Sequence, residues 1–323
     1  MSESMLGGSD EQQVLAALRD WLNRGDPAWL CTIVEVTGSS PRPLGALMAC
    51  RGDGLIAGSL SGGCVEEDLV ARLGRGELAG VQPELLTYGL SAEQNERLGL
   101  PCGGRLVVLV EPCTRDAHLE HVEQLLAALA QRRCAQREVR LDSGACQWRE
   151  VARVSALVLE SGVLRHTLGP RYRLLLVGAG QLSQSVALLA MMLDYRVSVC
   201  DPRRALIDAW PGPDVERVCA MPDDFLRAAG VDRFTAIITL THDPRIDDMA
   251  LMEALGLDAF YVGALGSQRT SAKRRERLRE LDLDEAQIAR LHAPVGLDIG
   301  SKRPLEIAIA ILAELIALRR GQS

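Results

Sequence analysis

The sequence predicts an α/β protein: an N-terminal α+β domain with glycine-rich cysteine loops, then a C-terminal Rossmann-like, doubly wound parallel sheet. Its 323 residues exceed the roughly 250–300 at which a single core stops growing, so two domains are expected. The first half carries two glycine-rich stretches, at residues 38–68 and 100–104. The second half alternates short apolar runs with helical patterns, which is typical of parallel βαβ units. We expect domains over residues 1–169 and 170–323, divided near Gly169 and Pro170.

The first half should open with a helix over residues 10–24, because Ser9 can cap it and Gly25 can end it. The Gly52-Asp53-Gly54 turn predicts a hairpin between two short strands. Acidic residues after Cys64 are typical of the first turn of a helix. The expected order is therefore strands 29–37, 46–51 and 55–60, helix 65–73 beginning at Cys64, strand 84–88, helix 92–98, strand 105–111, helix 117–132, and a β-rich stretch over 138–168.

The second half should form strands over residues 173–177, 196–200, 236–241 and 260–262, with helices between them. A final helix over 305–318 is apolar on nearly every face, so it is either buried or shared with a second copy of the chain. We therefore expect a homodimer. The apolar run of this final helix is broken by Glu314 and is shorter than the roughly 20 residues that a bilayer requires, so no membrane association is expected.

Composition excludes several function classes. A net charge of −7 and only 11 aromatic residues argue against a nucleic-acid partner. The polar start carries no secretion signal, and nine cysteines form no disulfide framework. We expect a cytoplasmic protein, in which most thiols act as small hydrophobic side chains.

One loop of the second half has the features of a dinucleotide site. Residues 174–183, LLLVGAGQLS, form a strand that enters a G-x-G-x-x-S turn and a helix. Gly178 suits the tight turn, while Gly180 would let a pyrophosphate approach the helix that opens at Gln181. Asp201 follows about twenty residues later, where an acid would hold a ribose 2′-hydroxyl. The pattern favours NAD over NADP as a candidate ligand.

Two further loops should meet at the same edge, because ligands of open α/β sheets bind at the carboxyl ends of the strands. His242 and Asp243 follow one strand and could serve an NAD-dependent oxidoreductase. The alternative is that His242 only braces Asp243, and that Asp243 caps a helix with proline at its first position. The other loop would seat an anion at the start of a basic helix through Gly263, Gly266, Ser267 and Arg269.

The cysteine loops of the first half offer soft ligands. Cys64 stands at a helix N-terminus, which favours the thiolate, although Glu66 and Glu67 oppose it. Cys102 lies between Pro101 and Gly103. If the two loops meet, both thiols would face a pocket lined by glycine amides, a setting that suits a thiophilic metal. Two alternatives stay open: thiols that merely pack in the loops, and a thiol that carries sulfur as a persulfide. No C-x-x-C pair supports a structural zinc site.

A set of motifs then matches a known family: GSSPRPLGALM, GSLSGGCVEEDL, LGLPCGG, LLLVGAGQLSQSVA, CDPR, LTHDPRIDD, YVGALGSQRT and LHAPVGLDIGSKRPLEIAIAILAEL. In this order, and over nearly the whole chain, they resemble the xanthine dehydrogenase accessory factor (XdhC/CoxI-type) family. The resemblance implies a non-catalytic maturation factor for molybdenum hydroxylases, linked to purine catabolism. Such a chaperone binds molybdenum cofactor, supports its sulfuration by a cysteine desulfurase, and delivers it to apo-xanthine dehydrogenase or a related hydroxylase.

The resemblance also implies a site for that cofactor, a pterin with a phosphate tail and a dithiolene-bound molybdenum. Glycine-loop amides would hold the phosphate, and Cys64 or Cys102 would contact molybdenum. Glu66 and Arg42 would bind the pterin or neutralise the phosphate. The implied cofactor-binding residues are Ser40, Arg42, Gly62, Gly63, Cys64, Glu66, Cys102 and Gly103.

Overall fold

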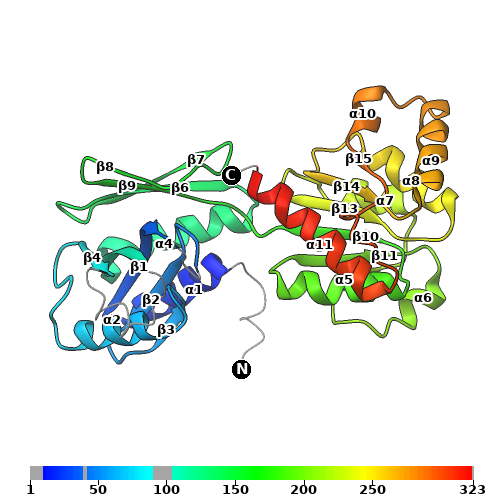
Figure 1. The fold of residues 1–323 in the computed structure, drawn as a ribbon. Helices are drawn as coiled ribbons and strands as arrows, with labels where there is room; N and C mark the ends of the chain where they lie inside the picture. The colour runs from blue at the N-terminus through cyan, green and yellow to red at the C-terminus, as the bar shows by residue number, and fades with distance from the viewer. Residues whose placement is uncertain (1–9, 39–41, 90–103, 322–323) are drawn as a thin grey trace. The chain divides into compact units, whose positions relative to one another are not determined.

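The computed structural model describes residues 10–38, 42–89 and 104–321, and the chain divides into two compact units, Met1–Pro170 and Arg171–Ser323 (Figure 1). Each unit has its own sheets, helices and core, and the mixed α/β fold predicted from the sequence is confirmed. The predicted helix over 92–98 lies outside the described residues. No helix in the described ranges is long and apolar enough to cross a membrane.

The first unit is built on a five-stranded antiparallel sheet with helices on both faces. Apolar side chains of α2, such as Leu69, pack on one face against Ile33. On the opposite face, Leu18 of α1 and Leu125 of α4 pack against Leu30. The strands follow the order β3-β2-β1-β5-β4, with β1 at Ala28–Thr37, β2 at Leu47–Arg51, β3 at Ile56–Gly58, β4 at Glu84–Tyr88 and β5 at Arg105–Cys113. The helices are α1 at Asp10–Arg24, α2 at Cys64–Gly74 and α4 at Arg115–Ala130.

The β-rich stretch is a second antiparallel sheet of the same unit, in the order β7-β6-β9-β8. It packs on the first sheet, where Val107 and Leu109 meet Val139 and Leu164. A buried ion pair between Arg137 and Glu111 lies beside this contact. The strands are β6 at Cys134–Arg140, β7 at Cys146–Val151, β8 at Val158–Glu160 and β9 at Val163–Leu168.

The register places three glycine-bearing loops at one end of the five-stranded sheet. Thr37, the last residue of β1, pairs with Arg105, the first of β5, and Tyr88 at the end of β4 pairs with Leu106. Gly58 at the end of β3 pairs with Met48 near the start of β2. The loops that follow β1, β3 and β4 therefore leave the sheet at the same end.

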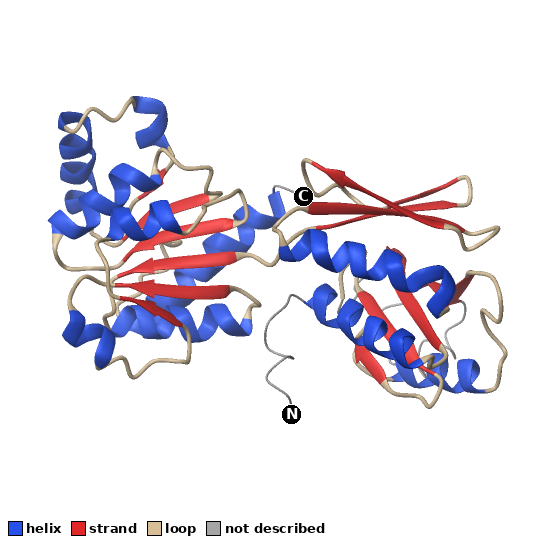
Figure 2. Cartoon of the chain, turned by 180° about the vertical axis from the view of Figure 1, so that it is seen from behind, coloured by secondary structure: helices blue, strands red, loops and turns tan. Residues whose placement is uncertain are grey.

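The second unit is a six-stranded parallel sheet between two layers of helices, as Figure 2 shows. Its order is β12-β11-β10-β13-β14-β15, so the chain reverses direction across the sheet at β10. The strands are β10 at Arg173–Val177, β11 at Arg196–Cys200, β12 at Glu216–Val218, β13 at Thr235–Thr239, β14 at Tyr261–Ala264 and β15 at Leu291–His292. Four of them confirm the sequence prediction. The two edge strands, β12 and β15, have only three and two residues, too few to show a periodicity.

The helices of this unit pack on opposite faces of the sheet. Val186 of α5 and Ile311 of α11 share one core, and Leu251 of α8 and Leu278 of α9 share the other. The helices are α5 at Gln181–Met192, α6 at Arg204–Asp208, α7 at Pro222–Ala228, α8 at Pro244–Ala254, α9 at Gln268–Glu280, α10 at Glu285–Ala289 and α11 at Pro304–Gly321.

Candidate functional site

The loop between β3 and α2 folds around a carboxylate of its own chain. Glu66 is 5% exposed and accepts the backbone N–H groups of Leu60, Ser61, Gly62 and Gly63 at 2.7–2.9 Å. The hydroxyls of Ser59 and Ser61 also donate to it, at 2.8 and 2.5 Å. Burial alone would raise the pKa of Glu66, but these hydrogen bonds hold it far below its ordinary value. The glycine amides that sequence reasoning assigned to a phosphate are therefore occupied by Glu66.

Cys64 is the first residue of α2 and is exposed. Because Glu66 fixes the loop immediately before it, the thiol is presented from a rigid turn at a helix N-terminus. The other described cysteines are buried or half-buried. Arg42 donates to Asp10 at 3.1 Å, so it is held by α1 rather than by the loop of Glu66. Ser40, Cys102 and Gly103 lie outside the described residues.

The glycines on either side of residues 90–103 show which loop ends lie close together. A Cβ added to Gly38 would lie 3.3 Å from the Cα of Gly104, and one added to Gly89 would lie 2.1 Å from the Gly104 carbonyl oxygen. Since Gly38 and Gly89 both have a positive φ, only glycine satisfies both the backbone conformation and the space. The ends of the loops after β1 and β4 are therefore packed together.

A cavity of about 410 Å³ lies beside the loop of Glu66. This volume falls within the range of roughly 300–1,000 Å³ that is usual for small-ligand sites. Its walls combine glycine backbone, two aliphatic side chains and one exposed acid. The lining residues are Gly54, Ile56, Ser59, Gly62, Gly63, Glu66, Glu67 and Val70.

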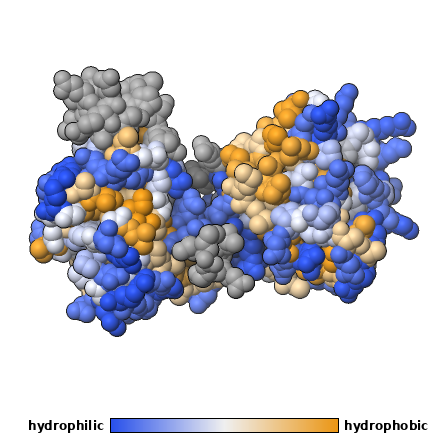
Figure 3. Space-filling view, turned by 90° about the horizontal axis from the view of Figure 1, so that it is seen from below, coloured by the Kyte–Doolittle hydropathy of each residue, from blue (hydrophilic) through white to orange (hydrophobic). Residues whose placement is uncertain are grey.

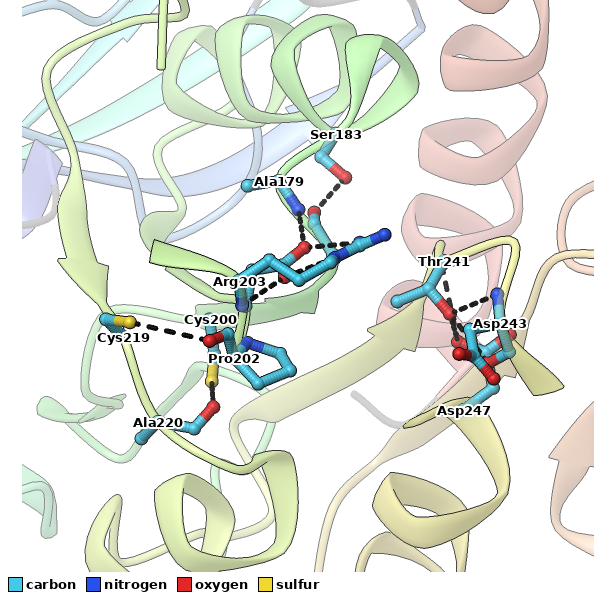
Figure 4. A network of polar contacts seen from close by, with 12 residues as sticks. Ala179, Ser183, Cys200, Pro202, Arg203, Cys219, Ala220, Thr241, Asp243 and Asp247 are labelled. Carbon is cyan, nitrogen blue, oxygen red and sulfur yellow. Dashed lines mark hydrogen bonds and ion pairs between the residues drawn. The ribbon is translucent and has the colours of Figure 1, made fainter. Parts of the chain in front are cut away.

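In the second unit, the glycine loop lies at the reversal of strand order, where α/β sheets bind ligands. Gly178 has a φ of +110°, and an added Cβ would lie 2.9 Å from the side chain of Thr241. Ser183 donates to the Gly178 carbonyl at 2.5 Å, so the serine in place of the third glycine locks the turn (Figure 4). Gly180 and Gln181 are exposed at the start of α5, where the sequence predicted a pyrophosphate.

Asp201 does not lie as a ribose-binding acid would. It is fully buried, accepts the Ala179 N–H at 2.9 Å, and receives both the backbone N–H and the guanidinium of Arg203 at 2.7–2.9 Å. Burial would raise the pKa of Asp201, but these hydrogen bonds keep it below its ordinary value. The half-exposed Arg203 guanidinium forms an ion pair with the buried carboxylate instead. The NAD preference drawn from Asp201 does not fit this placement.

The loop after β13 follows the capping part of the structural alternative. Asp243 caps α8 by accepting the N–H of Arg245 at 3.0 Å, with Pro244 at the first helical position. Hydrogen bonds from Arg245 lower the pKa of Asp243 to about 2. His242 is exposed and is not braced by Asp243, whose carboxylate turns to Arg245.

The loop before α9 also has structural roles. Gly263 lies inside β14, where an added Cβ would lie 2.6 Å from the Tyr261 ring, so it serves packing rather than a phosphate. Ser267 caps α9 by accepting the Thr270 N–H at 3.1 Å. Gly266 is half-buried and Arg269 is exposed beside them.

Sequence reasoning missed the buried ion pair that joins these two loops. Asp247 accepts the hydroxyl of Thr241 at 2.7 Å and pairs with Arg274 at 2.9 Å, while Arg274 also donates to the Leu265 carbonyl. The residues are 27 positions apart, and each sits in a helix whose charges look solvated from sequence alone. Within the described parts of the chain, no group of three or more metal-ligating side chains converges on one point.

Comparison with known proteins matches both halves of the chain to one family. Residues 174–315 match the XdhC Rossmann domain, and residues 21–89 match the XdhC and CoxI family. The chain belongs to the XdhC and CoxI family. The matched ranges contain the loop of Glu66, Cys64 and the glycine loop of the second unit.

Relatives of this XdhC and CoxI family chain extend over nearly its full length. The molybdenum cofactor insertion chaperone PaoD of Escherichia coli is 28% identical and covers 97% of this chain and 90% of its own. A protein of Bacillus subtilis named as a probable xanthine dehydrogenase subunit is 28% identical, covering 91% of this chain and 94% of its own. A crystal structure of a protein described as a xanthine dehydrogenase from Bacillus halodurans superposes with a TM-score of 0.78 at 26% identity, covering 98% and 97% of the two chains.

Proposed function

We propose that this chain is a molybdenum-cofactor maturation factor that carries the cofactor as cargo. In this role it binds the cofactor, supports its sulfuration, and inserts it into xanthine dehydrogenase or a related molybdenum hydroxylase in the cytoplasm. Support comes from the family and from the name of PaoD, a molybdenum cofactor insertion chaperone that aligns with 97% of this chain.

The observation that carries the proposal is the presentation of Cys64. Its thiol is exposed at the start of α2, on a loop whose amides are fixed by the buried Glu66. A thiolate is a soft donor that suits molybdenum in transit or a sulfur atom that is to be passed on. The loops after β1 and β4 leave the sheet at the same end as the loop after β3, which leads to Cys64.

The second unit supports a carrier over an NAD-dependent oxidoreductase. Asp201, the acid predicted to hold a ribose hydroxyl, instead accepts hydrogen bonds from Ala179 and Arg203. The Asp243 carboxylate caps α8. We infer that the chain acts stoichiometrically, without turnover of its own.

Partners of three kinds follow from the proposal: a cysteine desulfurase, the recipient apo-hydroxylase and a second copy of the chain. The homodimer is supported by apolar side chains exposed on neighbouring α5 and α11, namely Leu188, Met191, Met192, Leu305 and Ile309. Figure 3 shows hydrophobic surface gathered on this unit. Light scattering of wild type and of Met192→Lys tests it: a dimer that the lysine dissociates supports the pairing, and a monomeric wild type rules it out.

Cofactor loading tests the function. Purified protein is mixed anaerobically with molybdenum cofactor, desalted and assayed for bound molybdenum and pterin. We expect about one equivalent on wild type and on Cys219→Ala, a matched control from the second unit. Loss of molybdenum in Cys64→Ala or Cys102→Ala would assign the thiol. A wild-type protein that retains neither molybdenum nor pterin would rule out the carrier function, and NADH titration at the Gly178 loop would then be the next measurement.

A further inference from the structure

The cavity beside α2 is open where its two loop glycines lie. A Cβ added to Gly62 or to Gly63 would meet nothing within 4 Å, although both residues line the cavity. Neither glycine is therefore required for packing at that point, and the missing side chains leave space that a ligand can approach closely. Ile56 and Val70 supply apolar walls to the same space.

Two neighbouring glutamates line this cavity, and they differ in whether the carboxylate is already hydrogen-bonded within the chain. The Glu66 carboxylate is saturated by six donors and cannot bind a ligand without releasing the loop. Glu67 is exposed on the wall, and no side chain in the described part of the chain pairs with its carboxylate. The cavity therefore offers an acceptor, while the donors that an anion would need are turned inward.

We propose that this cavity binds the pterin ring of the cargo, with Glu67 accepting hydrogen bonds from the ring's amino and N–H groups. The inference rests on the proposed function and specifies which end of the cofactor binds here. A flat, neutral ring with a donor-rich edge fits glycine backbone, aliphatic walls and a free carboxylate. A phosphate does not fit, because the amides that would bind it belong to Glu66 and the remaining charged side chain is negative.

The position of Cys64 agrees with this assignment. Gly63 lines the cavity and Cys64 follows it directly, so a ring held in the cavity brings the rest of the cargo near the thiol. Glu67 follows three residues later, within the same first turns of α2. The ring and the soft end of the cofactor would thus be bound by residues from one short segment of the chain.

The experiment is a fluorescence titration of the full-length protein with 6-hydroxymethylpterin, a neutral pterin without phosphate or metal. We expect wild type to bind it, and Glu67→Gln to bind about tenfold more weakly, because hydrogen bonds to a charged acceptor are lost. Gly63→Ala should weaken binding similarly, since the added methyl group meets no other atom of the chain within 4 Å and takes up space at the wall of the cavity. Excess inorganic phosphate should not compete.

Matched controls keep the test specific. Glu123→Gln removes an exposed acid of α4, and Gly74→Ala adds a methyl group at the end of α2 where nothing lies within 4 Å; both should bind like wild type. A wild type that does not bind the pterin, or Glu67→Gln and Gly63→Ala variants that bind it equally well, would overturn the inference. The cofactor-loading assay decides the proposed function separately. If Glu67→Gln and Gly63→Ala retain as much cofactor as wild type, the cavity is not the pterin-binding site, while the carrier function still stands.

Discussion

The Oδ2 atom of Asp201 accepts the backbone N–H of Ala179 at 2.9 Å, so the end of β11 fixes the glycine loop that follows β10. The acid is built into the loop rather than turned toward a ligand. Arg203 completes the arrangement by donating to both carboxylate oxygens.

Replacing Asp201 should therefore destabilise the second unit. Asp201→Ala leaves the buried Ala179 N–H without an acceptor and frees the Arg203 guanidinium, so we expect a loss of about 2 kcal/mol in the free energy of unfolding. Urea denaturation measures it. Asp208→Ala, which removes an exposed acid 3.9 Å from Arg204, should cost less than about 0.5 kcal/mol. Equal effects of the two substitutions would contradict a structural role for Asp201.

Glu66 should make the first unit sensitive to acid. Its folded-state pKa is lowered, so the unfolded state binds the proton more tightly and stability falls as pH drops below the unfolded value of about 4.3. Chemical denaturation at pH 6 and pH 3.5 should show a larger loss for wild type than for Glu66→Gln, which has no such proton to bind. At pH 6, Glu66→Ala should cost about 3 kcal/mol, since four backbone N–H groups lose their acceptor. Identical pH profiles for wild type and Glu66→Gln would argue against this assignment.

His166 should add a second acid-sensitive element in a higher pH range. Burial, with the nearby charge of Arg137, lowers its pKa to about 3, below the unfolded value of about 6.5. Stability then falls as pH drops from 6.5 toward 3, by about 2 kcal/mol at pH 5 from this group alone. Denaturation at pH 7 and pH 5 should show that difference in wild type and its absence in His166→Gln. An imidazole NMR signal of His166 that titrates near pH 6.5 would refute the assignment.

Cys64 should be the first described cysteine to react with a thiol reagent. It is the exposed one of the eight that the structure describes, and burial raises the pKa of Cys31, Cys50, Cys113, Cys146 and Cys200. Brief treatment with iodoacetamide followed by peptide mass spectrometry measures the order. We expect labelling of Cys64 to be complete while Cys31 and Cys200 are unmodified. Early labelling of either would mean that the native core opens on that timescale.

The sequence predicted the elements that local signals define. Periodicity and turn residues placed β10 and β11 at their observed bounds, and the acids after Cys64 placed the start of α2. These local signals could not predict which group an acidic side chain would hydrogen-bond in the folded chain. Glu66 was read as a ligand for the cofactor, yet its carboxylate turns back onto its own loop. Its spacing from the glycine loop predicted that Asp201 binds a ribose hydroxyl. That spacing cannot show that the Arg203 guanidinium forms an ion pair with the Asp201 carboxylate.

The pairing of Asp247 with Arg274 shows the same limit over a longer distance. The two residues are brought together only when α8 and α9 pack beside β13 and β14, so nothing local announces them. The sequence also cannot predict which carboxylates, such as that of Glu67, have no side-chain partner among the described residues. Whether a carboxylate is paired depends on the folded chain.

The self-occupied loop of Glu66 has a kinetic consequence. A carboxylate tethered three to six residues from the amides it binds accepts six hydrogen bonds at once, so a dissolved anion could enter only by breaking all of them. The turn before Cys64 is thus held in one conformation by the chain itself, without a bound anion. A carrier that must accept and release the same molecule gains from this, since neither step has to wait for that turn to refold.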